Sequence, residues 1–193
     1  MTLWGVIAGG RGLRFGQPKV SAVHGGRTFL EAMLAVIDTA RDPDDRVAIG
    51  VAVDSDDPAI GGRVVVRDLV SAPGPAHSIA RLAACAAQTG DDLVFMPVDM
   101  LALTAPTLSR LRARLEENRR ELRDAIVVAR CGDRVHWVLG AVPSVLLGRV
   151  VAGADSVSAV QSLLRLCPLD YLEVTEDELL DVNTPESLPD EGR

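Results

Sequence analysis

The glycine-rich stretch IAGGRGLRFGQPK, residues 7–19, holds the residue types that bind a phosphate group. Glycines can adopt backbone conformations that bring N–H groups close to a ligand, and such amide-lined loops bind anions. Arg11, Arg14 and Lys19 would supply positive charge in the same stretch. Both common phosphate-binding patterns are absent, because no Gly-Lys-Ser/Thr follows and Phe15 stands where the dinucleotide pattern needs its last glycine. The stretch therefore predicts a loop that holds a small anion.

Lys19 is the only lysine of the chain, and every other basic residue is an arginine. A lysine ammonium is a compact, flexible point charge, whereas the arginine guanidinium is a planar fork. A lysine at this place therefore favours a functional role, although one lysine retained by chance on a solvated loop is the alternative. The first acidic residue is Glu31, although the net charge is −7. Carboxylates in this opening would repel a bound polyanion.

The amino-acid composition and charge of the chain exclude several classes of function. The 193 residues suit one domain, and 48% are hydrophobic but only 3% aromatic, which predicts a core of Val, Leu, Ala and Ile. The acidic balance argues against nucleic-acid binding by charge. Three cysteines lie far apart, so neither a zinc site nor a disulfide framework is indicated. Only six apolar residues, Leu3–Ala8, open the chain, which predicts no signal peptide or membrane span and a cytoplasmic protein.

Short apolar runs alternate with helical patterns, which predicts an α/β fold with a mostly parallel sheet covered on both faces. Ligands bind such sheets beyond the carboxyl ends of the strands. The loop at 9–19, Asp68 and Asp99 all follow expected strands. The expected strands are Leu3–Ala8, Val47–Val53, Arg63–Val66, Leu93–Met96, Ala125–Ala129, His136–Val142 and Leu169–Val174, and the expected helices are Thr28–Ala40, Ala76–Gln88, Thr104–Arg123, Pro143–Val151 and Ser156–Leu166.

Asp99 ends the segment LVFMPVDM at residues 93–100. A buried strand that carries one aspartate at its carboxyl end can hold Mg²⁺, which prefers hard oxygen ligands. The alternative is an aspartate that caps a helix or forms a turn. Asp68 ends VVVRD in the same way, and its simplest interpretation is a loop carboxylate.

The stretch from Ile7 to Lys19 resembles the signature of nucleotidyltransferases that read Leu-Ala-Gly-Gly, three variable residues, Arg, an apolar residue, Gly, two residues, Lys. The double glycine is most similar to the molybdenum cofactor guanylyltransferases, the MobA-like NTP transferases. The resemblance implies a three-layer, Rossmann-like nucleotidyltransferase fold, with residues 1–193 as a single domain. It assigns nucleotide binding to Ile7, Ala8, Gly9, Gly10, Arg11, Lys19, Asp68 and Asp99.

The same resemblance implies catalytic roles for Arg14, Lys19 and Asp99, with Mg²⁺ held by Asp99 and Asn183. Asn183 lies in DVNTPESL, residues 181–188, which is similar to the closing motif of the family. It could equally cap the last helix. Gly74-Pro75 would shape the pocket wall, whereas His136 falls on a family histidine and stays outside the main site.

The resemblance implies transfer of GMP from GTP to molybdopterin with release of pyrophosphate. The implied partners are GTP, a molybdopterin-type phosphorylated acceptor and molybdoenzyme maturation proteins, with the protein a monomer or weak oligomer and neither nucleic acid nor membrane as a partner. Cytidylyl transfer from CTP, a phospholactate acceptor and a non-catalytic nucleotide-binding relative remain open. A sugar-phosphate nucleotidyltransferase would normally need a longer chain.

Three departures from the family pattern bear on specificity. Asp54 stands where guanylyltransferases have an asparagine, which puts guanine selection in question. The segment GADSVS, residues 153–158, lacks the late basic pair that would contact the pterin phosphate. Ala76-His77-Ser78 replaces Leu-Ala-Gly at a turn that faces the substrate in the family.

Overall fold

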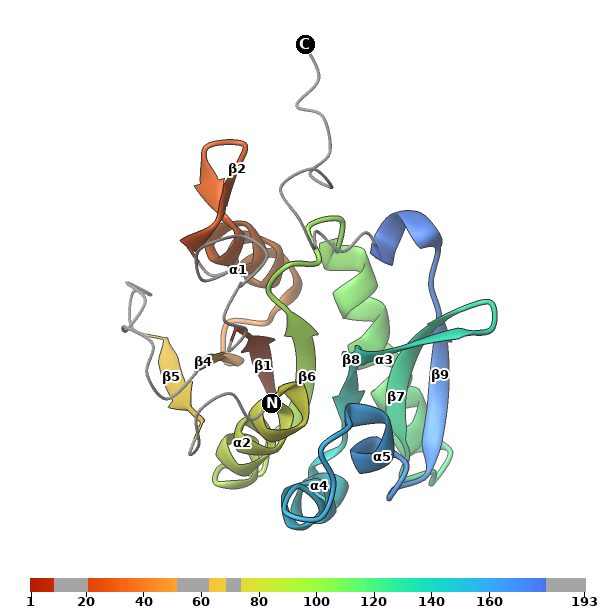
Figure 1. Ribbon diagram of the computed structural model, residues 1–193. Coiled ribbons are helices and arrows are strands. Elements are labelled where there is room, and N and C mark those ends of the chain that lie inside the picture. Colours follow the sequence, from red (N-terminus) through yellow and green to blue (C-terminus); the bar gives the residue numbers. More distant parts are fainter. Residues whose placement is uncertain (9–20, 52–62, 69–73, 180–193) are drawn as a thin grey trace.

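A seven-stranded sheet forms the centre of the computed structural model, in the order β5-β4-β1-β6-β8-β7-β9 (Figure 1). The structure describes residues 1–8, 21–51, 63–68 and 74–179. All seven strands expected from the sequence are present, with ends that differ by a few residues. They are β1 (Thr2–Ile7), β4 (Arg46–Val51), β5 (Val64–Arg67), β6 (Asp92–Pro97), β7 (Ile126–Cys131), β8 (Arg134–Val142) and β9 (Leu169–Glu173).

The sheet is mostly parallel, as predicted. Strands β5, β4, β1 and β6 pair in parallel, and so do β7 and β9, whereas β8 runs antiparallel to both β6 and β7. The reversal follows from a tight hairpin. Cys131 pairs with Arg134, so only Gly132 and Asp133 form the turn, and Gly132 has a φ of 55°. With its two flanking residues, the turn therefore spans residues 131–134, between the two strands expected from the sequence.

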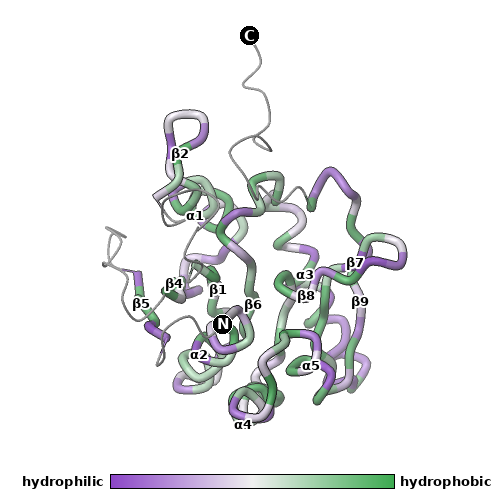
Figure 2. Tube along the Cα trace, viewed as in Figure 1, coloured by the Kyte–Doolittle hydropathy of each residue, from purple (hydrophilic) through white to green (hydrophobic). Residues whose placement is uncertain are grey.

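Helices cover both faces of the sheet (Figure 1). On one face α1 (Phe29–Ala40) and α3 (Ala105–Arg120) pack against the sheet, and on the other face α2 (Pro75–Ala87), α4 (Leu147–Gly153) and α5 (Val160–Leu164) do so. Because strand side chains alternate between faces, Trp4 and Val6 of β1 enter the first core and Leu3 and Ile7 the second. Hydrophobic residues accordingly concentrate along the central strands (Figure 2).

Local capping confirms two predicted helix starts. Thr28 begins α1 with a capping box, in which its hydroxyl accepts from the Glu31 N–H and the Glu31 carboxylate accepts from the Thr28 N–H. Thr104 caps α3, because its side chain accepts a hydrogen bond from the Thr107 N–H.

Among the described helices, none has an apolar stretch of the length that a membrane span requires.

Several boundaries differ from the expectation. Helix α3 ends at Arg120 rather than Arg123, and Leu122 adopts a φ of 56° just beyond it. The expected helix at 143–151 begins as a 3-10 turn at Ser144–Leu146 before α4, and the one at 156–166 is helical only over α5. Two elements were not predicted from the sequence: a small hairpin of β2 (Val23–His24) and β3 (Arg27–Thr28), and a 3-10 turn at Glu176–Leu179.

The amino edge of the sheet, where β1 and β4 begin, is held by one buried carboxylate. Asp45 accepts hydrogen bonds from the backbone N–H of Thr2 at 2.8 Å and from the indole N–H of Trp4 at 3.0 Å. The Asp42 N–H donates at 3.0 Å and the Arg112 guanidinium at 3.2 Å. These four donors join β1, α3 and the loop before β4 at one point.

Candidate active site at the carboxyl edge

The strand order changes direction between β1 and β6. After β1 the chain adds β4 and then β5 on one side, and it returns through α2 to add β6 on the other side. Such a switch point leaves a crevice beyond the carboxyl ends of the two strands, which is the usual ligand site of open α/β sheets.

Ile7 and Ala8 lie at this edge, as predicted, and both are buried. The N–H of Ala8 donates to the Gly50 carbonyl at 2.8 Å, which ties the end of β1 to β4. On the other side, the Val98 N–H donates to the Ile7 carbonyl at 3.1 Å, which ties it to the end of β6. The start of the predicted glycine loop is therefore fixed to both neighbouring strands.

Asp99 follows Val98 directly and is half-buried. It therefore lies at the carboxyl end of β6, one residue beyond the hydrogen bond to β1, where the sequence predicts a metal-binding carboxylate. Mg²⁺ is commonly held by one or two carboxylates together with water and substrate phosphates, so a single carboxylate at this edge fits that ion. Within the described ranges, His, Cys, Asp and Glu form no cluster of three or more that could hold a metal.

Asp68 lies at the carboxyl end of β5 and is only 2% exposed. Its N–H donates to the Val51 carbonyl at 2.9 Å, and its two carboxylate oxygens lie 3.3 and 3.1 Å from the Ser78 hydroxyl. Burial raises the pKa of the Asp68 carboxyl, whereas the Ser78 hydroxyl and the charges of His77 and Arg81 oppose that rise. The two predicted carboxylates, Asp68 and Asp99, thus share one edge of the sheet but differ in burial.

Gly74-Pro75 opens α2, as predicted. Gly74 is the N-cap residue with a φ of 80°, a conformation that favours glycine, and no side chain caps the helix. Arg81 lies in the second turn of α2. Its guanidinium donates to the Arg67 carbonyl at 3.3 Å, and this hydrogen bond joins α2 to the end of β5. The Nδ1 atom of His77 is buried and has no hydrogen-bond partner among the residues that the structure describes.

The other predicted site residues lie outside the described residues. They are Gly9, Gly10, Arg11, Arg14, Lys19 and Asn183, together with Asp54, which marks a departure from the family pattern.

His136 is buried near the start of β8, opposite Ala129. Burial lowers the pKa of its imidazole, and the nearby Arg134 acts in the same direction. These surroundings favour a neutral ring.

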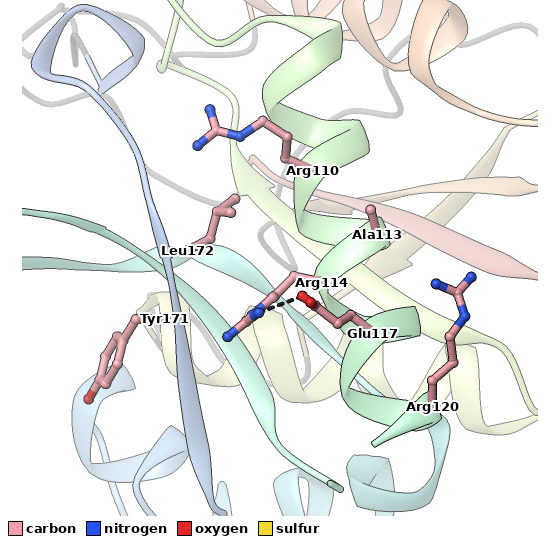
Figure 3. A pocket seen from close by; sticks show the side chains of 7 residues that line it. All are labelled: Arg110, Ala113, Arg114, Glu117, Arg120, Tyr171 and Leu172. Atoms are coloured by element: carbon pink, nitrogen blue, oxygen red, sulfur yellow. Dashed lines mark hydrogen bonds and ion pairs between the residues drawn. The ribbon is translucent and has the colours of Figure 1, made fainter. Parts of the chain in front are cut away.

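A separate groove of about 490 Å³ lies between α3 and β9 (Figure 3). Three strands separate β9 from β1, so this groove is remote from the switch point. Its arginines have acidic partners: Arg114 pairs with Glu117 and Asp170, and Arg110 pairs with Glu178. Its lining residues are Arg110, Ala113, Arg114, Glu117, Arg120, Tyr171 and Leu172.

The family model described as the MobA-like NTP transferase domain matches residues 5–170. The chain belongs to this family. The matched range includes the carboxyl end of β1 and all of β6, the two strands that flank the switch point. The resemblance seen in the glycine-rich stretch therefore extends over most of this chain. No curated protein matches it.

Solved structures share the fold at low identity. The molybdopterin-guanine dinucleotide biosynthesis protein A of Archaeoglobus fulgidus is 14% identical, with a TM-score of 0.71 over 97% of this chain and 94% of that one. Rv0371C of Mycobacterium tuberculosis, solved in complex with manganese, is 20% identical, with a TM-score of 0.69 over 96% and 95%. The 2-C-methyl-D-erythritol 4-phosphate cytidylyltransferase of Thermus thermophilus is 20% identical, with a TM-score of 0.65 over 97% and 95%. The predicted nucleotidyltransferase fold is confirmed.

The contact between Ser78 and Asp68 was not predicted from the sequence. One sign of it was present, because Ser78 stands where the family signature has glycine, but the two residues are ten positions apart in the chain.

Proposed function

We propose that this MobA-like protein transfers GMP from GTP to the phosphate of a molybdopterin-type acceptor and releases pyrophosphate. The observation that carries the proposal is the position of Asp99 at the switch point, one residue beyond the hydrogen bond between Val98 and Ile7. A triphosphate above the end of β1 would then lie between the glycine loop and a strand-end carboxylate. The family match supports nucleotidyl transfer as the reaction class.

In this reaction an oxygen of the acceptor phosphate attacks the α-phosphorus of GTP. A new P–O bond forms, the bond from the α-phosphorus to the bridging oxygen breaks, and pyrophosphate leaves with that electron pair. Both reactants are anionic, and two unit charges 4 Å apart repel by about 4 kcal/mol at an effective dielectric constant near 20. The main task of the protein is therefore to supply countercharge.

The chain has residues for that task. Asp99, with Asn183 as a second oxygen ligand, would hold Mg²⁺, which neutralises charge on the triphosphate and on the leaving pyrophosphate. Lys19 and Arg14 would contact the phosphates, and the backbone N–H groups of Gly9 and Gly10 would bind their oxygens. A phosphate nucleophile is already ionised near neutral pH, so the reaction needs no general base.

Cytidylyl transfer is a second candidate. Asp54 replaces the asparagine associated with guanine, and the cytidylyltransferase fold covers nearly the whole chain. A phospholactate acceptor in place of molybdopterin belongs to the same reaction class.

Pyrophosphate release with GTP, CTP or ATP, in the presence of Mg²⁺ and each acceptor, tests the proposal. We expect release that requires both GTP and molybdopterin. Release with CTP, or with phospholactate, would reassign the substrate within the class. Nucleotide binding without release for any pair would instead support a non-catalytic nucleotide-binding relative.

A further inference from the structure

Ser78 makes an unusual contact for a residue near the start of a helix. It is the fourth residue of α2 and is 2% exposed. A serine at such a position commonly bonds to the carbonyl four residues earlier. Here its hydroxyl donates to the Asp68 carboxylate instead, at 3.1 and 3.3 Å from the two oxygens. The contact joins the first turns of α2 to the carboxyl end of β5.

The first turns of α2 favour the ionised form of Asp68. His77 and Arg81 bring positive charge toward it, and Arg81 is held in place by the Arg67 carbonyl. The positive end of the helix dipole lies in the same turns, at Gly74. Burial is the larger effect and raises the pKa of the Asp68 carboxyl, and these neighbouring groups oppose part of that rise.

The hydrogen-bonding capacity of Asp68 is only partly used. A carboxylate has about four acceptor sites, and the side chain of Asp68 receives one hydroxyl among the described residues. Asp45, equally a buried aspartate, receives four separate donors. The remaining sites of Asp68 suit a ligand group that donates hydrogen bonds. Phosphate does not qualify, because it carries negative charge and would be repelled.

We infer that Ser78 is a positioning residue, which orients Asp68 so that its remaining oxygen lone pairs accept hydrogen bonds from the nucleoside part of the substrate. The donors would be the N–H groups of the base or the hydroxyl groups of the ribose. This inference rests on the proposed function and deepens it. The family resemblance already implies nucleotide binding by Asp68, and the new element is Ser78, whose hydroxyl orients that carboxylate in a way that the glycine of the family signature could not.

Calorimetric binding tests the inference. The probes are Mg²⁺ with the nucleoside triphosphate that wild type binds best among GTP, CTP and ATP, and Mg²⁺ with inorganic tripolyphosphate, which has no nucleoside. The variants are Ser78→Ala, Ser78→Thr, Asp68→Asn and the double variant Ser78→Ala/Asp68→Asn. Ser156→Ala is the matched control, because it removes a hydroxyl that bonds to the Gly153 carbonyl in a turn after α4.

We expect Ser78→Ala to weaken nucleotide binding by about tenfold, the scale of one hydrogen bond to a charged group. Asp68→Asn should weaken it at least as much, and the double variant should be no weaker than Asp68→Asn alone, because Ser78 acts through Asp68. Ser78→Thr, which keeps the hydroxyl, should bind more tightly than Ser78→Ala. Tripolyphosphate binding should weaken in none of the variants, and nucleotide binding by Ser156→Ala should stay unchanged.

Additive losses in the double variant, equal losses for nucleotide and tripolyphosphate, or no loss in Ser78→Ala would each overturn the inference. If Ser78→Thr does not fold, the double-variant comparison decides alone. Failure of the proposed function has a different signature, since wild type would then bind nucleotide but release no pyrophosphate with any acceptor, and the binding comparison of the variants would still test the inference. A wild type that binds no nucleotide would overturn the inference itself.

Discussion

The two edges of the sheet each contain a buried aspartate, and the two carboxylates differ in the number of hydrogen bonds that they accept. At the amino edge, Asp45 is 8% exposed and accepts from two backbone N–H groups, an indole and a guanidinium. At the carboxyl edge, Asp68 is 2% exposed, and its carboxylate receives a single hydroxyl within the described chain. Burial alone therefore does not distinguish a structural carboxylate from a candidate functional one.

The number of donors makes that distinction. A carboxylate with all its acceptor sites filled joins elements and has nothing left for a ligand, whereas one with unfilled sites is costly unless a ligand completes it. Asp99 extends the contrast, because it lies at the same carboxyl edge and is half-buried. We expect changes at the amino edge to lower stability and changes at the carboxyl edge to lower activity.

The amino edge should show the greatest change, a loss of folding stability. Asp45→Ala should lower the free energy of unfolding by about 3 to 5 kcal/mol, because it leaves the N–H groups of Thr2, Trp4 and Asp42 without their acceptor. Among the described residues, the half-buried Arg112 guanidinium keeps only its exposed acidic partner Asp42. Chemical denaturation measures this loss. Asp42→Ala is the matched control, since Asp42 binds the same Arg112 with a side chain that is 68% exposed, and its loss should be below about 1 kcal/mol. Equal losses for both variants would contradict the assignment of Asp45 as a structural carboxylate.

At the carboxyl edge, Asp99→Asn should reduce pyrophosphate release by about a hundredfold or more, the scale of one preorganised charge contact. Lys19→Ala should give a loss of similar size. Thermal unfolding of Asp99→Asn should stay close to wild type, because the half-buried amide replaces a half-buried carboxylate of the same shape. Steady-state rates at saturating Mg²⁺ and nucleotide check the prediction, and near-normal turnover in either variant would refute the role of that residue.

A smaller effect concerns the turn that opens α2. Gly74→Ala should destabilise the protein by about 1 kcal/mol, because alanine is strained at a φ of 80°. Gly148→Ala is the control, and we expect it to raise stability rather than lower it. Gly148 is exposed in α4, and a Cβ added there would have no atom nearby, so alanine should stabilise the helix by up to about 1 kcal/mol. Losses of the same size in both variants would argue against a special conformation at Gly74.

The smallest effect is a pH dependence of stability. Burial raises the pKa of Asp68 in the folded state above its value in the unfolded chain. The carboxyl therefore favours folding most at low pH, and that contribution is lost as the pH rises through the folded-state pKa. Asp68→Asn does not titrate, so its melting temperature relative to wild type should be higher at pH 8 than at pH 4, by no more than about 3 °C.

The matched control for this titration is Asp177→Asn, which changes an exposed carboxylate. Its melting temperature relative to wild type should vary less between the two pH values. A shift of opposite sign in Asp68→Asn would show that the folded protein stabilises the charged carboxylate overall.

The sequence predicted the parts of the structure that depend on local pattern. Apolar runs marked all seven strands, and Thr28 and Thr104 marked the starts of α1 and α3 through short-range capping. Strand ends placed Ile7, Ala8, Asp68 and Asp99 at one edge, because parallel strands share their carboxyl edge.

Features that depend on distant partners could not be predicted in the same way. The reversed direction of β8 leaves no trace in its apolar pattern, since either direction buries the same side chains. The β2–β3 hairpin turns on Gly25 and Gly26, with φ values of 59° and 73°, but its strands are too short to show a period. The bond between Ser78 and Asp68 crosses from a helix to a strand end, and no spacing rule relates these positions.

A structure determined with GTP and Mg²⁺ would show where the nucleotide binds. We expect triphosphate density beyond the end of β1, with Mg²⁺ between it and Asp99, and the nucleoside on the side of Asp68 and Ser78. Nucleotide density in the groove between α3 and β9, with the carboxyl edge between β1 and β6 left empty, would contradict this expectation.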